Sequence, residues 1–508
     1  MRTMPWTRSF EVWRTATGRL GKIVASAVSE PMLLALALTG LALVARLYGL
    51  GEKPLWYDEV LPLKRAGMPL AELATDAFRN KHYPTYFVLV SPFAGSEWSA
   101  WALRLPSALI GAVCVFLVAR IAHVAAGGVA AVTAGLLMAL SPMEVQFGQE
   151  ARSYTLTSAA ILLSMWTVVR LTSPGQQQPR DWLAYCFATA LALVTLSAAA
   201  PWFIAANLAV LAMWQRGSLR DAGWMRRWVT ANALAVACWL PALAILVSSN
   251  KAKPLGGLMW TPPLTPELVG QVFGAVYGLG ISDLMTLELF PTLVPGFGIA
   301  VAALAAVGAW RLRTSNVGLL LGIGAAAMPL VLFALSLFHP LLLPRYLLWS
   351  AGPYFVLAGV GVATVPRTWQ PAALAGVAVG AALSLLPYYA SETKPRWDLA
   401  ASYLAARVGP NDAVVTSSTL ASVVVEAYVK RSAPGAVDAV KFRPLPEVEA
   451  RVAAGGTVWL VHGRAGQGRV WPRDSFLDRW RVMGAIGAPT TFGRHIAIWR
   501  MVPEPPDN

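Results

Sequence analysis

Four adjacent residues, Trp56-Tyr57-Asp58-Glu59, place two carboxylates directly after the first long apolar segment of a chain that is poor in acidic residues. Only 13% of the 508 residues are charged, and an ionisable group near lipid is costly enough to indicate a function. Because Asp58 and Glu59 are adjacent, they point in different directions on any regular element. One of them can therefore accept a proton from an attacking hydroxyl while the other makes a structural hydrogen bond. The alternative is an interfacial charge pair that caps a loop helix.

A second polar cluster, Gln149-Glu150-Ala151-Arg152-Ser153-Tyr154, lies at the junction of two later apolar segments. The guanidinium of Arg152 matches phosphate oxygens with its fork of donors, and Glu150 or Tyr154 can orient it. An arginine that only reaches from the apolar segment toward water, with an ion-pair partner, explains the same pattern.

Two more clusters carry cationic side chains. Asn80-Lys81-His82-Tyr83-Pro84 offers Lys81 and His82 as phosphate donors, although a lone His is more often an ordinary loop residue, and no second His has metal spacing. His339-Pro340 is followed by Arg345-Tyr346. Arg345 is equally explained as an interfacial anchor.

The elements that must position these clusters are apolar segments of about 20 residues, the length that crosses roughly 30 Å of hydrocarbon. We predict a polytopic α-helical membrane protein with about 11 transmembrane helices. The predicted spans are 29–49, 101–120, 125–142, 152–170, 182–198, 200–214, 228–247, 292–310, 316–338, 346–364 and 370–388.

The distribution of Lys and Arg predicts the orientation, because cytoplasmic loops are enriched in basic residues. With a cytoplasmic N-terminus, one face collects the basic N-terminal arm 1–28, the loops near 216–227 and 311–313, and Arg120, Arg170, Arg180 and Arg367. All four polar clusters then face outward. The formal charge of +15 does not indicate nucleic-acid binding, because the arginines are spread over many short loops; contact with anionic lipids explains them better.

The outward segments should be ordered. In the first outer loop, 51–100, we expect a surface helix over Leu63 to Phe78 and an interfacial helix over Pro84 to Phe93. The second loop, 248–291, is rich in Pro and Gly and should be irregular with one short helix. Cys114, Cys186 and Cys238 lie in apolar segments and are expected to be plain packing residues.

The composition changes near residue 390, after the predicted membrane domain 29–389. Segments 397–407 and 422–429 read as helices, and 413–416, 458–461 and 496–501 read as strands. Such alternation predicts a small C-terminal α/β domain, 390–508, on the outer side.

The four clusters therefore converge on one face of the membrane. A carboxylate base with several cationic groups at the outer leaflet describes a site that takes a phosphate-linked lipid and uses its head group.

The order and spacing of several motifs resemble the GT-C membrane glycosyltransferases related to protein O-mannosyltransferases and the bacterial aminoarabinose lipid A transferase. The resemblance spans roughly residues 40–390. It is carried by Leu55-Trp56-Tyr57-Asp58-Glu59, His82-Tyr83-Pro84, Arg104-Leu105-Pro106-Ser107-Ala108, Ser141-Pro142 with the 149–154 cluster, and Arg345-Tyr346-Leu347-Leu348.

The resemblance implies transfer of a sugar from a polyprenyl-phosphate carrier to a lipid, polysaccharide or protein, with inversion, at the outer face of the bacterial cytoplasmic membrane. It implies Asp58 as the catalytic base and Glu59 as the second residue of the catalytic pair, in a support or acceptor role. Tyr57 and Glu150 are implied as further acceptor or support contacts. The residues implied for carrier phosphate and donor are Lys81, His82, Arg152, Tyr154, Arg345 and Tyr346. The family usually has His-Pro-Pro or Lys-Pro-Pro where this chain has His82-Tyr83-Pro84. The local backbone, and with it the orientation of the Lys81 and His82 side chains, can therefore differ from that of the family. We expect no metal and no cofactor.

Three other functions fit parts of the sequence. A ligase that acts on a lipid-carried glycan would share most of the site. A transporter or flippase would be expected to show internal repeats and polar residues near the bilayer midplane, whereas here they gather at one face. A non-catalytic assembly partner could use the outer domain but leaves Asp58 unexplained.

Overall fold

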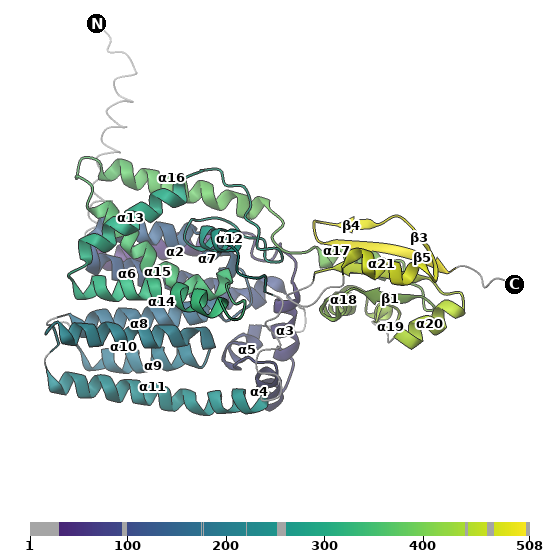
Figure 1. Cartoon of the computed structure of the whole chain (residues 1–508), viewed down its shortest axis with the longest axis horizontal. Helices are drawn as coiled ribbons and strands as arrows, with labels where there is room; N and C mark the ends of the chain where they lie inside the picture. Colours follow the sequence, from purple (N-terminus) through teal and green to yellow (C-terminus); the bar gives the residue numbers. More distant parts are fainter. Residues whose placement is uncertain are drawn as a thin grey trace, which may run out of the picture.

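The computed structural model describes residues 30–93, 99–173, 175, 177–219, 221–250, 261–441, 445–464 and 472–503. The predicted N-terminal arm 1–28 lies outside the described residues. Figure 1 shows a body of long helices lying side by side, with a smaller domain that projects beyond one end of them. The helices of the body are α2 (Pro31–Leu47), α6 (Ala100–Leu140), α8 (Tyr154–Thr172), α9 (Pro179–Leu193), α10 (Ala200–Gln215), α11 (Ala222–Ser249), α13 (Phe297–Leu312), α14 (Asn316–Ser336), α15 (Pro344–Ala363) and α16 (Gln370–Ala390).

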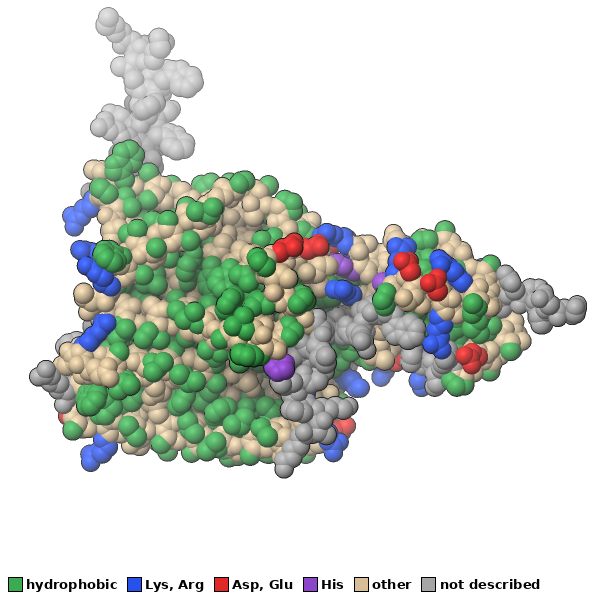
Figure 2. Space-filling model, in the orientation of Figure 1, with side chains coloured by type: hydrophobic (Ala, Val, Ile, Leu, Met, Phe, Trp, Pro, Cys, Tyr) green, Lys and Arg blue, Asp and Glu red, His purple; other side chains and the backbone are tan. Residues whose placement is uncertain are grey.

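All eleven predicted spans fall on these helices, and the helical membrane fold is confirmed. Among the described residues, seven helices are long and apolar enough to cross a membrane, and α2 and α13 are shorter apolar helices. Hydrophobic side chains cover the flank of the body, and Lys and Arg side chains lie at the end opposite the smaller domain (Figure 2). The number of helices that cross the bilayer stays a prediction.

α6 holds two of the predicted spans, because its backbone leaves helical geometry at Ala126 and Gly127. Gly127 has φ +79°, a conformation that favours glycine. The two halves then run beside each other. The guanidinium of Arg46 donates to the carbonyl of Ala139 at 3.1 Å, and a Cβ on Gly111 would lie 2.7 Å from its Nε.

α15 lies at the centre of the body and is largely buried. Its glycines allow neighbouring backbones to approach closely. A Cβ on Gly359 would meet the carbonyl oxygen of Ala130 on α6, and one on Gly361 would meet that of Leu304 on α13. This packing fixes the C-terminal half of α15, and Arg345 lies at the opposite, N-terminal end of the same helix.

Short helices cover the end of the body that faces the smaller domain, as Figure 1 shows for α3, α4 and α5. They are α3 (Tyr57–Ala66), α4 (Leu70–Arg79), α5 (Thr85–Val90), the 3₁₀ turn η1 (Ser91–Phe93), α7 (Pro142–Gly148) and α12 (Pro266–Val276). The prediction of one helix over 63–78 is wrong: Gly67 and Pro69 separate α3 from α4, because Pro has no amide hydrogen to continue a helix. The predicted helices near 84–93 and in the second loop are present as α5 with η1 and as α12. The position of α5 at the membrane interface stays a prediction.

The smaller C-terminal domain begins at α17 (Trp397–Ala405), after α16 ends at Ala390, and is the predicted α/β unit. Its sheet has the order β1-β2-β5-β3 with β4 also paired to β5; β1 and β2 are parallel and the other pairs are antiparallel. The strands are β1 (Ala413–Thr416), β2 (Val458–Gly463), β3 (Gly484–Ile486), β4 (Thr490–Phe492) and β5 (Ile496–Pro503), and the other helices are α18 (Thr419–Ser432), α19 (Val437–Val440), α20 (Leu445–Ala453) and α21 (Arg473–Arg481). The apolar core under α17 and α18 continues into α3 and α5. The domain therefore packs directly on the outer helices.

Candidate active site

The two adjacent carboxylates begin α3. Trp56, the residue before the helix, is fully buried, and Asp58 and Glu59 occupy the first turn, where the helix dipole favours negative charge. As expected from their adjacency, they have different partners. Asp58 faces a cluster of arginines and tyrosines, and Glu59 faces a separate buried ion-pair network.

Asp58 pairs with the end of α15. Arg345 Nη1 donates to Asp58 Oδ2 at 3.1 Å and to the hydroxyl oxygen of Tyr154 at 3.2 Å. Arg152 Nη2 lies 3.9 Å from the same Asp58 oxygen. Four residues from three distant parts of the sequence thus form one continuous polar cluster.

The loop between α4 and α5 supplies the remaining cationic positions. His82 Nε2 lies 3.5 Å from Arg152 Nη2, and a cavity of about 30 Å³ beside them is lined by Lys81, Ser153 and Thr195 among others. Burial, reinforced by Arg152, lowers the pKa of His82 well below its ordinary value. At neutral pH His82 is therefore an uncharged hydrogen-bonding group and not a cation.

Several polar atoms in this cluster have no hydrogen-bond partner among the described residues. They include Nε and Nη1 of Arg152 and Nδ1 of His82, all of them buried. Buried donors without a partner are costly, and most such groups in native proteins are satisfied. The cluster is chemically prepared to bind an anion.

Glu59, in contrast, is completely paired. Its carboxylate accepts four hydrogen bonds: Arg104 Nε at 2.7 Å, Arg104 Nη2 at 2.8 Å, Lys394 Nζ at 2.7 Å and the Ala151 amide at 3.1 Å. Burial alone would raise its pKa, but Arg104 and Lys394 lower the pKa of Glu59 to about 2. Glu59 is held as an anion with no oxygen left for a substrate.

Glu150 lies between the two carboxylate environments. It is fully buried, and neither of its carboxylate oxygens has a hydrogen-bond partner among the described residues. Burial raises the pKa of Glu150 to about 7, although the ammonium of Lys394 opposes this, and the nearby carboxylates of Glu59 and Asp58 add to the rise. This carboxyl group can change its charge near neutral pH.

The other predicted positions also gather here. Tyr346 packs against the apolar cluster that contains Trp56 and Tyr154, and Tyr57 packs at the edge of the core that joins α3 to the C-terminal domain. The unusual Tyr83 is buried, and its hydroxyl accepts a hydrogen bond from Trp239 Nε1 on α11 at 2.9 Å. His339 is exposed and has no place in the cluster.

The roles of two residues at the site were not predicted from the sequence. Arg104 was recognised only as part of a motif, yet its guanidinium also donates to the carbonyls of Leu50, Lys53 and Pro54 and so fixes the chain leading into α3. Lys394 gave no signal, because it stands 335 positions from Glu59 in a short connecting segment.

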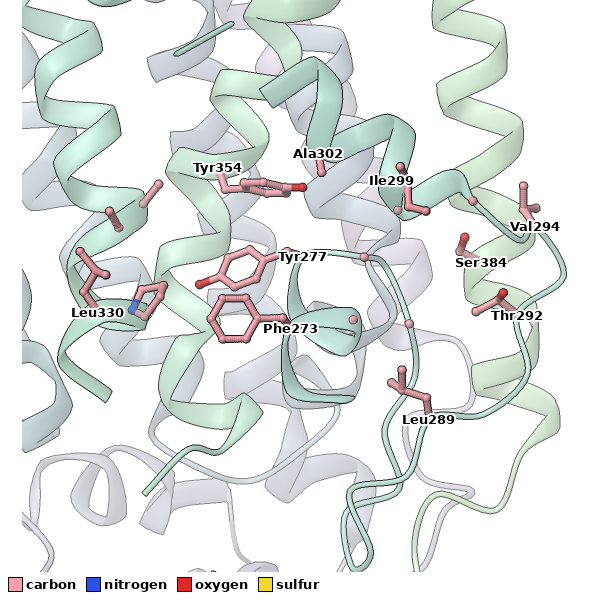
Figure 3. A pocket seen from close by; sticks show the side chains of 18 residues that line it. Phe273, Tyr277, Leu289, Thr292, Val294, Ile299, Ala302, Leu330, Tyr354 and Ser384 are labelled. Carbon is pink, nitrogen blue, oxygen red and sulfur yellow. The ribbon is translucent and has the colours of Figure 1, made fainter. Parts of the chain in front are cut away.

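A larger cavity of about 680 Å³ lies beside α12, α13 and α14, and its lining is mostly apolar. Figure 3 shows the rings of Phe273, Tyr277 and Tyr354 between Leu330 on one side and Leu289, Val294 and Ile299 on the other. Tyr277 is hydrogen-bonded to Ser350 of α15, and Tyr354 follows Arg345 by about 13 Å along that helix. The cavity has the size of a small-molecule site.

No three His, Cys, Asp or Glu side chains come together as a metal site within the described part of the chain.

Comparison with known proteins agrees with this architecture. Residues 89–248 match the family model described as dolichyl-phosphate-mannose-protein mannosyltransferase. This segment includes Arg104, Glu150, Arg152 and Tyr154. No curated protein matches the chain.

Solved structures match over nearly the whole chain. The crystal structure of ArnT from Cupriavidus metallidurans in the apo state has a TM-score of 0.61 at 14% identity, covering 91% of this chain and 97% of that one. ArnT bound to undecaprenyl phosphate matches with a TM-score of 0.55 at 14% identity, covering 92% and 97%. The archaeal oligosaccharyltransferase AglB from Archaeoglobus fulgidus, in complex with an inhibitory peptide and a dolichol-phosphate, has a TM-score of 0.52 at 12% identity and covers 85% and 69%.

The resemblance to GT-C membrane glycosyltransferases is therefore confirmed, in fold by these structures and over residues 89–248 by the family model. The predicted class, a polyprenyl-phosphate-dependent membrane glycosyltransferase, agrees with both comparisons.

Proposed function

We propose that the protein transfers a sugar from a polyprenyl-phosphate carrier to an acceptor, a lipid, polysaccharide or protein, at the outer face of the bacterial cytoplasmic membrane. The observation that carries this proposal is the single cluster of Asp58, Arg345, Tyr154, Arg152 and His82. Within the described part of the chain, two buried donors of Arg152 have no hydrogen-bond partner in this cluster, although Asp58 lies beside them. The solved relatives with undecaprenyl phosphate and dolichol-phosphate support the choice of carrier.

In this proposal the carrier phosphate binds to Arg152 and Arg345, with hydrogen bonds from His82, Tyr154 and Tyr346 and with Lys81 at the cavity rim. The apolar chain of the carrier lies in the cavity beside Tyr277 and Tyr354. A phosphate draws the two arginines from Asp58, because its fork-matched oxygens compete for the same donors. Binding of the donor therefore frees the Asp58 carboxylate.

Asp58 then accepts the proton of the acceptor nucleophile as that atom attacks the anomeric carbon. The new bond forms as the bond from that carbon to the phosphate oxygen breaks, so the configuration at the anomeric carbon inverts. Polyprenyl phosphate leaves, and the arginine donors stabilise the negative charge that its oxygen gains. Ionised Glu150 accepts a hydrogen bond from the donor sugar or the acceptor, with Tyr57 at the edge. Because Glu150 acts in its ionised form, its protonation then determines the acid limb of the pH profile of turnover, where turnover falls as the pH is lowered.

The deciding experiment measures consumption of radiolabelled polyprenyl-phosphate sugars by the purified protein in lipid, with membrane extract as the source of acceptors. We expect the wild type to consume one donor. Asp58→Asn should lose on the order of 10³-fold in turnover, as expected for removal of a general base, with carrier binding kept. Turnover by Asp58→Asn near the wild-type rate would contradict the base assignment, and no consumption of any donor would contradict the transferase itself.

A further inference from the structure

The segment that joins α16 to the C-terminal domain enters the site region. Residues Thr393 and Lys394 are buried, although they belong to a short connection between two helices. Connections normally run over the surface because their polar groups need water. A buried lysine in such a segment requires a specific partner.

The partner of Lys394 is Glu59, at 2.7 Å. The same carboxylate receives Arg104 and the amide of Ala151, and Ala151 stands between Glu150 and Arg152. Glu59 thus ties the first turn of α3, which carries Asp58, to the backbone that carries the two other charged residues of the site. Lys394 is the contribution of the connecting segment to this junction.

The first outer loop in turn places a lysine against the connecting segment. Lys53, in the chain leading into α3, donates to the carbonyls of Tyr388 and Ser391 and to the hydroxyl of Thr393, at 2.8, 2.9 and 3.1 Å. The first outer loop and the connecting segment therefore each insert a lysine into the other.

The C-terminal domain, which follows the connecting segment, also contacts the outer loops. The hydroxyl of Tyr428 on α18 accepts from the Leu55 amide and donates to the Leu55 carbonyl, directly before α3. On the other side, His495 pairs with Asp283 at 2.9 Å and Arg464 donates to the carbonyl of Met285. The domain thus holds both outer loops that cover the site.

We propose that Lys394 is a positioning residue, which through Glu59 fixes Asp58, Glu150 and Arg152 relative to one another, and that the C-terminal domain is thereby a structural part of the active site. The importance of this arrangement for turnover rests on the proposed function. The arrangement itself does not, so it can be measured separately.

Lys394 also supplies positive charge at the centre of the site. The charged and titratable groups around Glu150 are Lys394 of the connecting segment, Glu59 and Asp58 of α3, Arg345 of α15, Arg152, Tyr86 of α5 and Tyr388 of α16. Of these, Lys394 is the main group that lowers the pKa of Glu150 against burial. Loss of its charge should raise that pKa by about one unit or more.

The experiment compares Lys394→Met with Lys394→Arg, which keeps the charge, and with Lys430→Met, which makes the same chemical change at an exposed lysine of α18. Hydrogen exchange of the intact protein in lipid should become at least about tenfold faster in α3 and at Ala151 in Lys394→Met, because Glu59, which belongs to α3 and accepts from the Ala151 amide, loses one of its two cationic partners. Lys430→Met should match the wild type. If Lys394→Met does not fold, Lys394→Gln, which keeps a hydrogen-bond donor without the charge, takes its place.

Turnover provides the second measurement. Lys394→Met should move the acid limb of the pH profile to higher pH by about one unit and leave carrier binding within about threefold, and Lys394→Arg should restore the limb. The inference would be overturned if Lys394→Met left both the hydrogen exchange of α3 and the acid limb of the pH profile unchanged. It would also be overturned if Lys394→Met and Lys430→Met lost turnover equally at all pH values. If the wild type consumes no donor, the proposed function fails, and the exchange measurement alone then decides the positioning role.

Discussion

Asp58 and Glu59 are neighbours in the chain, but the clusters around them differ in how completely their polar groups are paired. Glu59 accepts four hydrogen bonds and pairs with two cations. Around Asp58, buried donors of Arg152 and His82 and both oxygens of Glu150 stand unpaired within the described chain. Since unpaired buried polar groups are costly, the Asp58 cluster is the one whose stability improves when a ligand binds.

The difference assigns separate roles to two adjacent carboxylates. The fully hydrogen-bonded network of Glu59 holds α3 in place, and the incompletely paired cluster of Asp58 beside it is available to bind a ligand. If this comparison is correct, substitutions in the two clusters should have opposite profiles in stability and in activity.

The largest effect on stability is expected at Glu59. Glu59→Gln leaves Arg104 and Lys394 buried without their anion, and breaking a buried pair in this way costs about 3–5 kcal/mol. Asp58→Asn should cost about 1 kcal/mol, because the amide oxygen of Asn can still accept the hydrogen bond that Arg345 donates to Asp58 Oδ2. Thermal unfolding of both variants in the same lipid or detergent measures the difference; equal losses of stability would remove the distinction between the clusters.

The next effect is on carrier binding. Arg152→Ala and Arg345→Ala should each weaken binding of polyprenyl phosphate about 10- to 100-fold, since a charge-assisted hydrogen bond contributes about 1.5–3 kcal/mol. A matched control is Arg396→Ala, which removes an arginine from a partly exposed pair with Asp398 on the C-terminal domain. Titration with the carrier lipid gives the dissociation constants. Binding that is weakened equally by the control would show that the effect is not specific to the site.

Glu150→Gln should stabilise the protein by an amount that depends on pH. Because burial raises the pKa of Glu150 to about 7, the folded wild type favours the protonated form, and this contribution to stability is complete below the ordinary value near 4 and is lost as pH rises to about 7. Gln does not titrate. The variant should therefore gain up to about 3 kcal/mol over the wild type at pH 8 and little at pH 4.

Unfolding at the two pH values measures this difference. The same substitution should lower turnover if Glu150 contacts a substrate. A variant that is less stable than the wild type at pH 8 would mean that Glu150 has a structural partner and belongs with Glu59.

The sequence predicted the helical membrane fold, the C-terminal α/β domain and the gathering of Asp58, Glu150, Arg152 and Arg345 at one end of the body, because composition and length determine which segments lie in lipid. It did not predict which carboxylate would be saturated. That depends on Lys394, whose pairing with Glu59 exists only after the two domains pack. The break between α3 and α4 was missed because the apolar pattern continues through Gly67, and the three-residue strands β3 and β4 are too short for a periodic signal.

Tyr83 offers the smallest and most local test of the comparison. The loop with Lys81 and His82 differs from the resembling family at this residue, and Lys81 has a positive φ of 64°, which is uncommon for a residue with a side chain. The hydrogen bond from Trp239 to the Tyr83 hydroxyl anchors this loop to α11. Tyr83→Phe should therefore cost about 1 kcal/mol in stability and reduce carrier affinity two- to fivefold, since Lys81 and His82 lose part of their orientation. Trp239→Phe removes the other partner and should give the same change in affinity, with no further loss in the double variant. Additive losses from the two substitutions would indicate that Tyr83 acts on the site through another contact, and the loop would then belong to the binding cluster in its own right.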